Sequence, residues 1–359
     1  MHSGIAKRIV AESGLPRLFS VLADELTPSD LQSLLLEVYQ QRARTVTEPE
    51  ALSRFERVPM LAASTVDARL LNEFDSVAFA AATDFEALEL SPVGPFGLSL
   101  ALGGIDQNNV LTTIRNADVL GDCTPVLALE CARRRRKKTE RGADRPVRLC
   151  SSHRVIRLQP FDFPGFTPHF RLFGMVSAGR DTGSSAFEMQ HLREHIGFYL
   201  RLFRALNAAG FSLTRPLVEV SDLAATGEHL VKAGVSREEI HQAIRAHRVG
   251  GSDQFLAGRG ITMPDDSPRF ALVREQVFAP LQQKHPEAEF RCTLSRLEGL
   301  GYYTGLCLRV SPAAPDGSRY PIADGGFTDW TARLLQDRKE RLLTSGIGSE
   351  FTCRRYRAA

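Results

Sequence analysis

Long hydrophobic runs and paired cysteines are both missing from this 359-residue sequence. No apolar stretch approaches the ~20 residues that a membrane helix needs, so an integral membrane protein is not expected. The first residues mix charged and apolar side chains without a secretory h-region. The six cysteines stand singly, without a CxxC pair, which argues against a zinc knuckle or a disulfide framework. A cytoplasmic protein is therefore expected.

A strong excess of one charge is missing as well. The net charge of +3 is too small to indicate a nucleic-acid partner, and none is expected. The distribution is uneven, because residues 133–138 form an unbroken run of six cations, followed by Arg141 and Arg145. Such a run can bind phosphates by releasing their counterions. It can also be a solvated connector whose like charges repel each other, and we favour this second interpretation.

Hydrophobic periodicity predicts an α+β fold, in which a largely antiparallel sheet is flanked by helices and interrupted by a helical insert. We expect a helical segment at 1–60, a core at 61–220 and 289–359, and the insert at 221–288. Strands are predicted in SVAFAAA (76–82), GLSLAL (97–102), VLTTI (110–114), VRLC (147–150) and RVIRL (154–158), and after the insert in FRCTL, YTGLCLRV and YPIAD. Helix starts are predicted from the capping boxes Ser29–Gln32, Ser185–Glu188 and Ser236–Glu239.

Four segments carry the candidate chemistry. They are VLGDCTPVLALECARR (119–134), PVRLCSSHRVIRLQ with PHFRLFGMVSAG (146–159 and 168–179), RLEGLGYYTGLCLRV (296–310) and ADGGFTDW (323–330). In this order they resemble the class II aminoacyl-tRNA synthetases. The similarity is greatest to the histidine branch and its paralogue, the regulatory subunit of ATP phosphoribosyltransferase. The resemblance implies the antiparallel catalytic core of that family.

The resemblance assigns a role to the polar residues of the first two segments. Asp122 and Thr124 match the positions that hold the substrate's α-ammonium, which a carboxylate and a hydroxyl suit chemically. They can also simply cap the following helix. Arg157 matches the arginine that clamps the α-phosphate of ATP and the amino-acid carboxylate. Gln159 stands where the family usually has glutamate, and Phe170 stands where a phenylalanine stacks on adenine.

The last two segments imply the walls of an amino-acid pocket. Tyr302 and Tyr303 belong to a YYTG sequence that matches the histidine-branch signature without a gap. Gly325, Gly326 and Asp329 match a glycine-rich turn that closes the pocket in the family. A lone GG or YY pair would carry no information, but the two motifs in this order are the most specific signal in the chain.

Several family residues are replaced. Phe351 stands where the arginine that holds the γ-phosphate belongs, and Glu298 replaces the catalytic arginine of the histidine branch. Glu298 and Glu350 can supply the oxygen ligands that Mg²⁺ prefers. The alternative is that ATP chemistry has been lost. Leu172 and Val176 replace the residues that contact histidine, so histidine is not the expected substrate. No anticodon-binding domain follows, which argues against ordinary tRNA charging.

Two function classes follow from this pattern. The first, slightly favoured from the sequence, is an ATP- and Mg²⁺-dependent ligase that activates an amino acid and transfers it to a small acceptor, a carrier protein or a peptide. The second is a non-catalytic paralogue that acts as a regulatory or scaffolding subunit of a partner enzyme. A homodimer is expected in both cases. Our candidate for the dimer-forming motif is the helix around 66–73 together with a strand after it.

Overall fold

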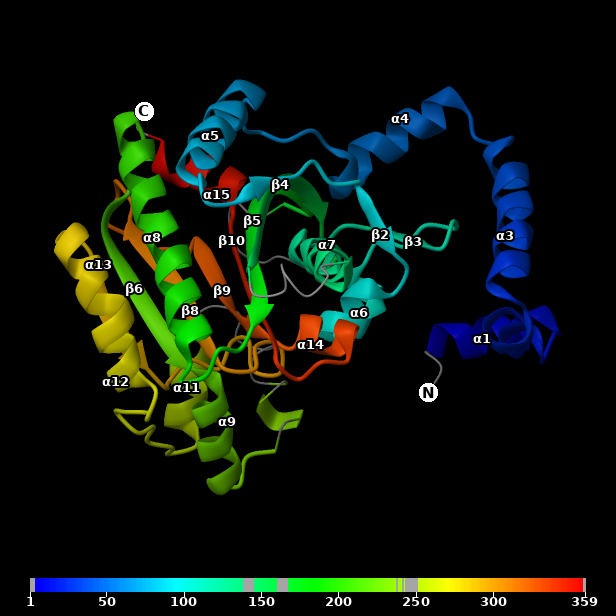
Figure 1. The fold of residues 1–359 in the computed structure, drawn as a ribbon. Coiled ribbons are helices and arrows are strands. Elements are labelled where there is room, and N and C mark those ends of the chain that lie inside the picture. The colour runs from blue at the N-terminus through cyan, green and yellow to red at the C-terminus, as the bar shows by residue number, and fades with distance from the viewer. Residues whose placement is uncertain are drawn as a thin grey trace.

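The computed structural model describes residues 4–137, 145–159, 167–236, 238–240, 242 and 251–357. Its centre is an eight-stranded sheet with the order β1-β4-β5-β10-β9-β8-β6-β7 (Figure 1). Neighbouring strands are antiparallel except for the two edge pairs, β1 with β4 and β6 with β7. The strands are β1 (Glu86–Ala87), β4 (Val147–Ile156), β5 (His169–Arg180), β6 (Thr214–Asp222), β7 (Glu289–Thr293), β8 (Leu306–Ala313), β9 (Ala323–Thr328) and β10 (Glu340–Ile347). The predicted antiparallel sheet flanked by helices is confirmed.

Helices cover both faces of this sheet. On one face lies α8 (Ala186–Ala208), whose apolar residues repeat every three to four positions and are buried against the strands, as predicted. The other face carries α7 (Thr124–Lys137) and α14 (Trp330–Leu335), which share a second apolar core with β4, β5 and β10. One face of the sheet is therefore covered by α8. The other face also carries the two-stranded sheet β2–β3 and the helix α6 (Figure 1). Their bounds are Val93–Pro95, Ala117–Val119 and Leu98–Gly103.

The described part of the predicted insert is helical. It connects β6 to β7 through α9 (Leu223–Lys232), α11 (Gly251–Gly258), α12 (Phe270–Leu272), the π-helix η4 (Val273–Phe278) and α13 (Ala279–Lys284). The Ser236–Glu239 capping box is confirmed, since each residue's side chain accepts a hydrogen bond from the other's backbone N–H at 2.9 and 3.2 Å. Within the described ranges, no helix has the length and apolar character needed to cross a membrane.

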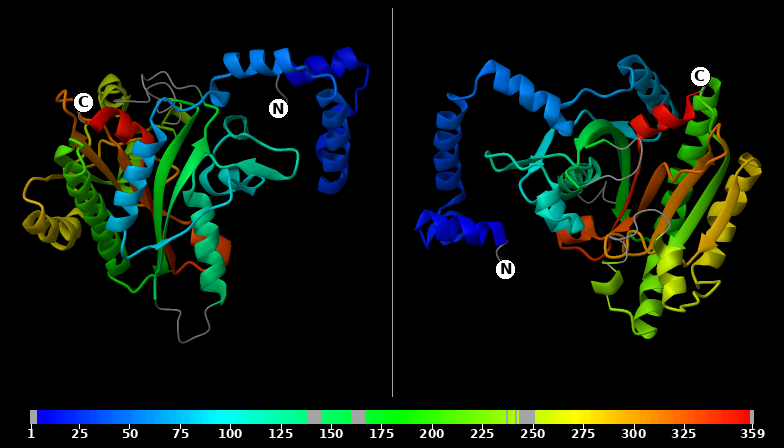
Figure 2. Two further views of the ribbon diagram at one scale, coloured as in Figure 1. Left: turned by 90° about the horizontal axis from the view of Figure 1, so that it is seen from above. Right: turned by 180° about the vertical axis from the view of Figure 1, so that it is seen from behind.

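The N-terminal residues form an arm that projects from the body (Figure 2). We define the arm as residues 4–57. It contains α1 (Gly4–Ser13), α2 (Leu18–Ser20), the π-helix η1 (Val21–Glu25), α3 (Pro28–Ala43) and α4 (Glu48–Arg57). A 3-10 turn, η2 (Pro59–Leu61), and an extended segment then lead into α5 (Ala68–Ala81), which packs on α8 and α15 (Ser349–Tyr356). None of the arm helices has a buried residue.

Two predicted strands are helices. The SVAFAAA segment belongs to α5, and GLSLAL forms α6. In α5 the buried residues Leu71, Phe74 and Ala78 follow helical spacing, and alanine is the best helix former, so the alanine-rich stretch continues the helix. The dimer-motif candidate at 66–73 therefore lies at the start of α5, and no strand follows it directly. VLTTI forms only an isolated bridge, between Thr112 and Asp118. VRLC and RVIRL belong to one strand, β4.

Two predicted helix caps are wrong. The α3 helix begins with Thr27 as its cap and Pro28 in the first turn, because the Thr27 side chain accepts from Asp30 N at 3.2 Å. At the start of α8, Ser185 has a φ of 55° and forms no side-chain cap bond. The α8 helix nevertheless begins where predicted, directly after Ser185, so only its capping bond is missing.

The basic run is largely the last turn of α7 rather than a connector. Arg133 and Arg134 pair with Glu130, and Arg134 also pairs with Glu86, at 2.5–2.7 Å. Arg135 forms a buried ion pair with Glu340. Lys138 and Arg141 lie outside the described residues. Three arginines of the described part of the run, Arg133, Arg134 and Arg135, are thus paired with carboxylates of the same chain. Their place at the C-terminal end of α7 is also favourable, because the helix dipole attracts cations there.

Candidate functional site

A cleft of about 580 Å³ opens on the α7 face of the sheet. It is lined by residues from α6, the start of α7, the end of β4, the start of β5, the turn before β8, the segment before β9, and β10. Seven predicted site residues line it: Asp122, Thr124, Arg157, Gln159, Phe170, Tyr302 and Tyr303. Five others do not: Glu298, Gly325, Gly326, Asp329 and Glu350. The cleft therefore gathers the residues of the first two motifs and the two tyrosines, whereas the glycine-rich turn predicted to close the amino-acid pocket and the predicted metal ligands lie outside its lining.

The first corner of the cleft is formed by Asp122 and Thr124 where β3 leads into α7. Oδ1 of Asp122 accepts from Thr124 N at 2.8 Å and from Thr124 Oγ1 at 2.9 Å. Asp122 thus satisfies a backbone N–H at the start of the helix, as an N-terminal cap does. Its second oxygen, Oδ2, lies 3.3 Å from Nη2 of Arg157. Since a carboxylate oxygen accepts more than one hydrogen bond, Oδ2 retains capacity for a ligand's ammonium group.

Arg157 forms the wall beside this corner. Its Nε atom donates to the Gly121 carbonyl at 2.7 Å, and its guanidinium lies over the Phe170 ring at 5.2 Å. A guanidinium held by a carbonyl, a carboxylate and an aromatic face is fixed in position, which suits recognition of a carboxylate. Gln159 lies two residues farther along and also lines the cleft.

Two tyrosines close the cleft from the turn before β8. The Tyr302 hydroxyl shares a hydrogen bond with Thr124, and burial raises the pKa of Tyr302 above its usual value. It is therefore Tyr302, not Tyr303, that reaches the Asp122 corner. Tyr303 instead donates to Oδ1 of Asp324 at 3.0 Å. Burial raises the pKa of Tyr303 well above its usual value, and the negative charge of Asp324 raises it further. Both hydroxyls are therefore neutral donors at physiological pH.

The Tyr302–Gly305 turn leads directly into β8, which pairs antiparallel with β9, the strand that contains the glycine pair. The two motifs thus lie side by side, but only the tyrosines of the first motif line the cleft together with Arg157. Gly326 is required there because a Cβ at this position would lie 2.6 Å from Cδ1 of Tyr303. Gly325 faces the opposite side, where a Cβ would lie 2.3 Å from Cβ of Ser345. The two glycines shape the cleft by allowing close packing.

Asp324 is a cleft residue that the sequence reasoning missed. It precedes the glycine pair and binds Nη2 of Arg296 at 2.7 Å in addition to the Tyr303 hydroxyl. Arg296 is buried, and its other donors bind the Glu298 and Leu308 carbonyls at 2.9 and 3.2 Å. The signal in the sequence was an acidic residue directly before GG. This acidic residue was not among the positions that the resemblance assigns to the site.

The remaining wall of the cleft is apolar. Phe351 lies on it, and its ring packs edge-on against Tyr320 with centroids 5.5 Å apart. Leu172 of β5 lines it from the sheet. Other apolar lining residues are Ile105, Val110, Pro321 and Ile322. This part of the cleft presents mostly aliphatic and aromatic carbon. Arg319 lines it beside Tyr320, and the Arg355 guanidinium lies over the rings of Tyr320 and Phe351 at 5.6 and 5.9 Å.

Two predicted site residues lie in surface ion pairs outside the cleft lining. The carboxylate of Glu298 accepts from Ser252 Oγ at 2.9 Å and lies 3.4 Å from Nη2 of Arg309. Asp329 precedes α14 and pairs with Arg333 four residues later at 2.9 Å, with both side chains about half exposed. The carboxylates of Glu298 and Asp329 thus have arginine partners within the protein.

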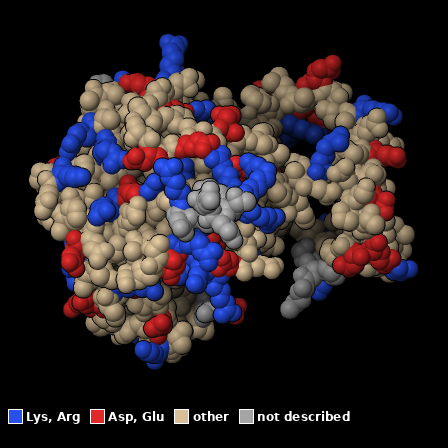
Figure 3. Space-filling view, viewed as in Figure 1, with Lys and Arg blue, Asp and Glu red and all other residues tan. Residues whose placement is uncertain are grey.

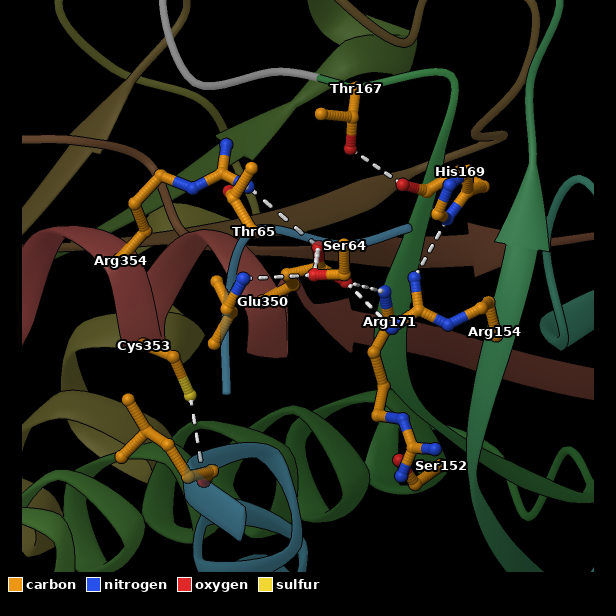
Figure 4. A network of polar contacts seen from close by, with 12 residues as sticks. Ser64, Thr65, Ser152, Arg154, Thr167, His169, Arg171, Glu350, Cys353 and Arg354 are labelled. Atoms are coloured by element: carbon orange, nitrogen blue, oxygen red, sulfur yellow. Dashed lines mark hydrogen bonds and ion pairs between the residues drawn. The ribbon is translucent and has the colours of Figure 1, made fainter. Parts of the chain in front are cut away.

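Glu350 is enclosed in a polar network at the start of α15 (Figure 4). Its side chain is 2% exposed and lies 3.0 Å from Nη2 of Arg154 and 3.7 Å from Nη2 of Arg354. It also accepts from Ser64 Oγ at 2.5 Å and from Arg171 N at 3.1 Å. Ser64 belongs to the segment that connects the arm to the body, so Glu350 fastens this segment to the sheet.

These contacts test whether the site suits magnesium and a triphosphate. The two carboxylates predicted to bind Mg²⁺ pair with different arginines, Glu350 with Arg154 and Glu298 with Arg309. No group of three or more His, Cys, Asp or Glu residues suited to a metal occurs among the described residues. The two cleft arginines are engaged, Arg157 as above and Arg319 with Glu289 and two backbone carbonyls at 2.7–3.2 Å. Glu298 and Glu350, the carboxylates predicted to bind Mg²⁺, therefore do not form a magnesium site on the cleft.

Comparison with known proteins gives the fold a name. No protein-family model and no curated sequence matches the chain. Among solved structures, an ATP phosphoribosyltransferase regulatory subunit/histidyl-tRNA synthetase from Bacillus halodurans is 14% identical over 82% of each chain, with a TM-score of 0.59. A histidine–tRNA ligase subunit from Alicyclobacillus acidocaldarius is 17% identical over 82% of this chain and 95% of its own, with a TM-score of 0.55. A histidyl-tRNA synthetase from Nostoc sp. is 17% identical over 82% and 73%, with a TM-score of 0.55. The chain has the fold of the class II aminoacyl-tRNA synthetase core.

Proposed function

We propose that the cleft binds a small molecule with a free ammonium group and an apolar body, most simply an α-amino acid with a large side chain. In this proposal the chain acts as a non-catalytic regulatory or scaffolding subunit rather than as an adenylate-forming enzyme. The observation that carries the proposal is the contact of Phe351 with Tyr320. It puts aromatic carbon where the resemblance expects the arginine that holds the γ-phosphate. The nearby Arg355 guanidinium lies over these two rings.

The polar half of the cleft supports an amino-acid ligand. Asp122 offers a carboxylate oxygen to an ammonium, Thr124 lies beside it, and Arg157 offers a guanidinium to a carboxylate. Charge-assisted hydrogen bonds of this kind are worth about 1.5–3 kcal/mol each. The side chain of the ligand then extends toward Leu172 and Phe170, where burial of apolar surface adds affinity at roughly 25 cal/mol per Å².

A regulatory role implies a protein partner. The Bacillus halodurans neighbour is named as a regulatory subunit of an enzyme, so a partner enzyme for this chain belongs to the proposal. A homodimer and a cytoplasmic location also belong to it, as expected from the sequence. The ligand would then alter the partner by favouring one conformation of the subunit, which requires different affinities for the two states.

The amino-acid ligase predicted from the sequence is the second candidate. One observation favours it: Arg157 lies over Phe170, and the resemblance assigns these two residues to the α-phosphate and the adenine. The paired state of Glu298 and Glu350 weighs against it. In this second case Arg157 orients the carboxylate, and the acceptor is a small molecule, a carrier protein or a peptide.

One experiment separates the two functions. The melting temperature of the full chain is measured with each of the twenty standard L-amino acids, and then with the amine and the carboxylic acid derived from the best binder. We expect the amino acid to stabilise most, the amine less and the acid not at all, because binding to the native state raises stability. Amino-acid-dependent pyrophosphate–ATP exchange should be absent. Exchange above background would establish the ligase, and binding of the acid alone would contradict the ammonium site.

A further inference from the structure

The cleft contains a second carboxylate besides Asp122. Among the described residues that line it, the acidic ones are Asp122 and Asp324, whose side chains are 28% and 38% exposed. Asp324 lies on β9 directly before the glycine pair, and the resemblance gives it no role. After burial, the negative charges of both carboxylates raise the pKa of Tyr302. The two carboxylates therefore act on the same part of the cleft.

Asp324 is held in place by two donors of the protein. Its Oδ1 atom accepts from the Tyr303 hydroxyl at 3.0 Å, and its Oδ2 atom accepts from Nη2 of Arg296 at 2.7 Å. Each oxygen of a carboxylate accepts about two hydrogen bonds, so each keeps one acceptor position among the described contacts. Arg296 is buried and is not part of the cleft lining. A ligand in the cleft therefore meets the carboxylate rather than the guanidinium behind it.

The charges behind Asp324 balance each other. Nε of Arg309 lies 3.7 Å from Oδ2 of Asp324, and Nη2 of the same side chain lies 3.4 Å from Oε2 of Glu298. Two arginines, Arg296 and Arg309, thus face two carboxylates. Neither arginine lines the cleft, so Asp324 presents an acceptor to a ligand, and a group with N–H donors is its chemical complement.

The sheet register places Asp324 across the cleft floor from the Asp122 corner. Asp324 pairs with Gly346 of β10, and Gly346 pairs with Gly174 of β5. Thr124, which binds Asp122, lies over Gly174, since a Cβ there would be 3.3 Å from Cγ2 of Thr124. Two strand spacings, roughly 10 Å, separate Gly174 from Asp324. Gly346 lines the cleft without a side chain, so the floor between the two carboxylates is open.

We propose that Asp324 binds a cationic side chain, so that the ligand is a basic α-amino acid with a long, unbranched side chain, such as lysine or arginine. The inference rests on the proposed function, in which Asp122 holds the α-ammonium group. The methylene stem lies along Leu172 and Gly346, and the cationic end reaches the open acceptor positions of Asp324. Basic side chains commonly pack their stem on apolar surface while the charged end contacts a polar partner.

The outer surface does not select for a cation. Figure 3 shows Lys and Arg side chains interspersed with Asp and Glu on the face in view, and the net charge of the chain is +3. A positive overall charge does not attract a basic ligand at long range. Selection for a cationic ligand therefore comes from contacts inside the cleft.

Matched ligand pairs test the inference on the unaltered full chain. Calorimetric titration gives the affinities of L-lysine and L-norleucine, and of L-arginine and L-citrulline. Within each pair the second member lacks the charge at the end of the side chain. We expect one basic amino acid to bind about ten- to a hundredfold more tightly than its neutral partner, because it gains a charge-assisted hydrogen bond. The pair that shows the difference distinguishes an ammonium from a guanidinium. Equal affinities within both pairs would overturn the inference.

Asp324→Asn assigns the preference to this carboxylate. The substitution keeps the size of the side chain and removes its charge, so the basic amino acid should bind no more tightly than its neutral partner. Asp337→Asn is the matched control, because Asp337 is 34% exposed, pairs with Arg180 at 3.1 Å and lies outside the cleft lining. It should keep the full preference. A preference that survives in a folded Asp324→Asn protein would contradict the assignment, and melting curves establish folding.

Failure of this inference differs from failure of the proposed function. If neutral amino acids bind as well as basic ones, the ammonium site at Asp122 stands and only the role of Asp324 is lost. If none of the twenty standard L-amino acids binds, both are lost.

Discussion

Asp122 and Arg157 form an ion pair of 3.3 Å at the closed end of the cleft, although thirty-five positions separate them in the sequence. The pair joins the start of α7 to the end of β4. The two charges of the pair balance each other. A zwitterionic ligand can replace the contact between Asp122 and Arg157 with two new contacts, one from its ammonium group to Asp122 and one from its carboxylate to Arg157. This relationship explains why the site suits an amino acid better than a polyanion.

Glu350→Gln should destabilise the protein by about 2–3 kcal/mol. The substitution keeps the shape but leaves Arg154 and Arg354 facing a neutral amide at a site where Glu350 is 2% exposed. Denaturant unfolding measures the change. Glu25→Gln is the control, since Glu25 pairs with Arg17 on the surface and such pairs are worth under about 1 kcal/mol. Equal stability of the two variants would contradict a fastening role for Glu350.

Gly326→Ala should cost about 1–3 kcal/mol and weaken ligand binding. The added Cβ would lie 2.6 Å from Tyr303 and 2.8 Å from Cβ of Cys307, so the ring must leave its position on β9. Gly258→Ala, at a helical position with nothing within 4 Å, is the matched control and should not be destabilising. If both alanines unfolded at the same denaturant concentration, the close packing of Tyr303 on the glycine would be disproved.

Stability should fall as the pH is lowered from about 6.5, in part because of His195. This side chain is buried between Ser177 and Ser345, and burial lowers its pKa to about 3. The unfolded chain takes up the proton near pH 6.5 and the native chain does not, so stability present above pH 6.5 is lost as the pH falls toward 3. Between these two pH values the titration of His195 lowers the free energy of unfolding by up to about 1.4 kcal/mol per pH unit.

His195→Gln removes that proton uptake from the unfolded state. We expect the variant to be less stable at pH 7, with a shallower loss of stability between pH 6.5 and 5 than the wild type. Unfolding free energies at half-unit pH steps give both slopes. Identical slopes would mean that His195 is protonated in the native state, against its burial between α8 and strands β5 and β10.

The sequence predicted part of the cleft, but not the helix α6 that forms one wall or the cleft residue Asp324. Asp122, Arg157 and Tyr302 each belong to a motif whose strand, turn or helix could be predicted locally, and the order of the motifs indicated one sheet. The failures have local causes. The alanine-rich second half of α5, residues 76–82, was predicted as a strand because its short apolar run fits both periods, and only packing on α8 decides between them.

The separation of Glu298 and Glu350 from the cleft could not be predicted. A carboxylate near a motif is equally compatible with a metal ligand and with an ion pair. Arg309 lies only eleven positions from Glu298, but two partners of Glu350 come from distant segments. Arg154 precedes Glu350 by 196 positions, and Ser64 precedes it by 286. Such long-range partners are set by the fold, not by local spacing.

The central claim is that Asp122 anchors the ammonium group of a ligand in the cleft. Asp122→Asn keeps an acceptor for Thr124 N and removes the charge, so the fold should be retained. The measurement is calorimetric titration of wild type and variant with the L-amino acid that stabilises the wild type most. We predict a dissociation constant raised about ten- to a hundredfold, with nearly unchanged melting temperature of the free protein. Equal affinity of the two proteins would contradict the ammonium site and the function proposed from it.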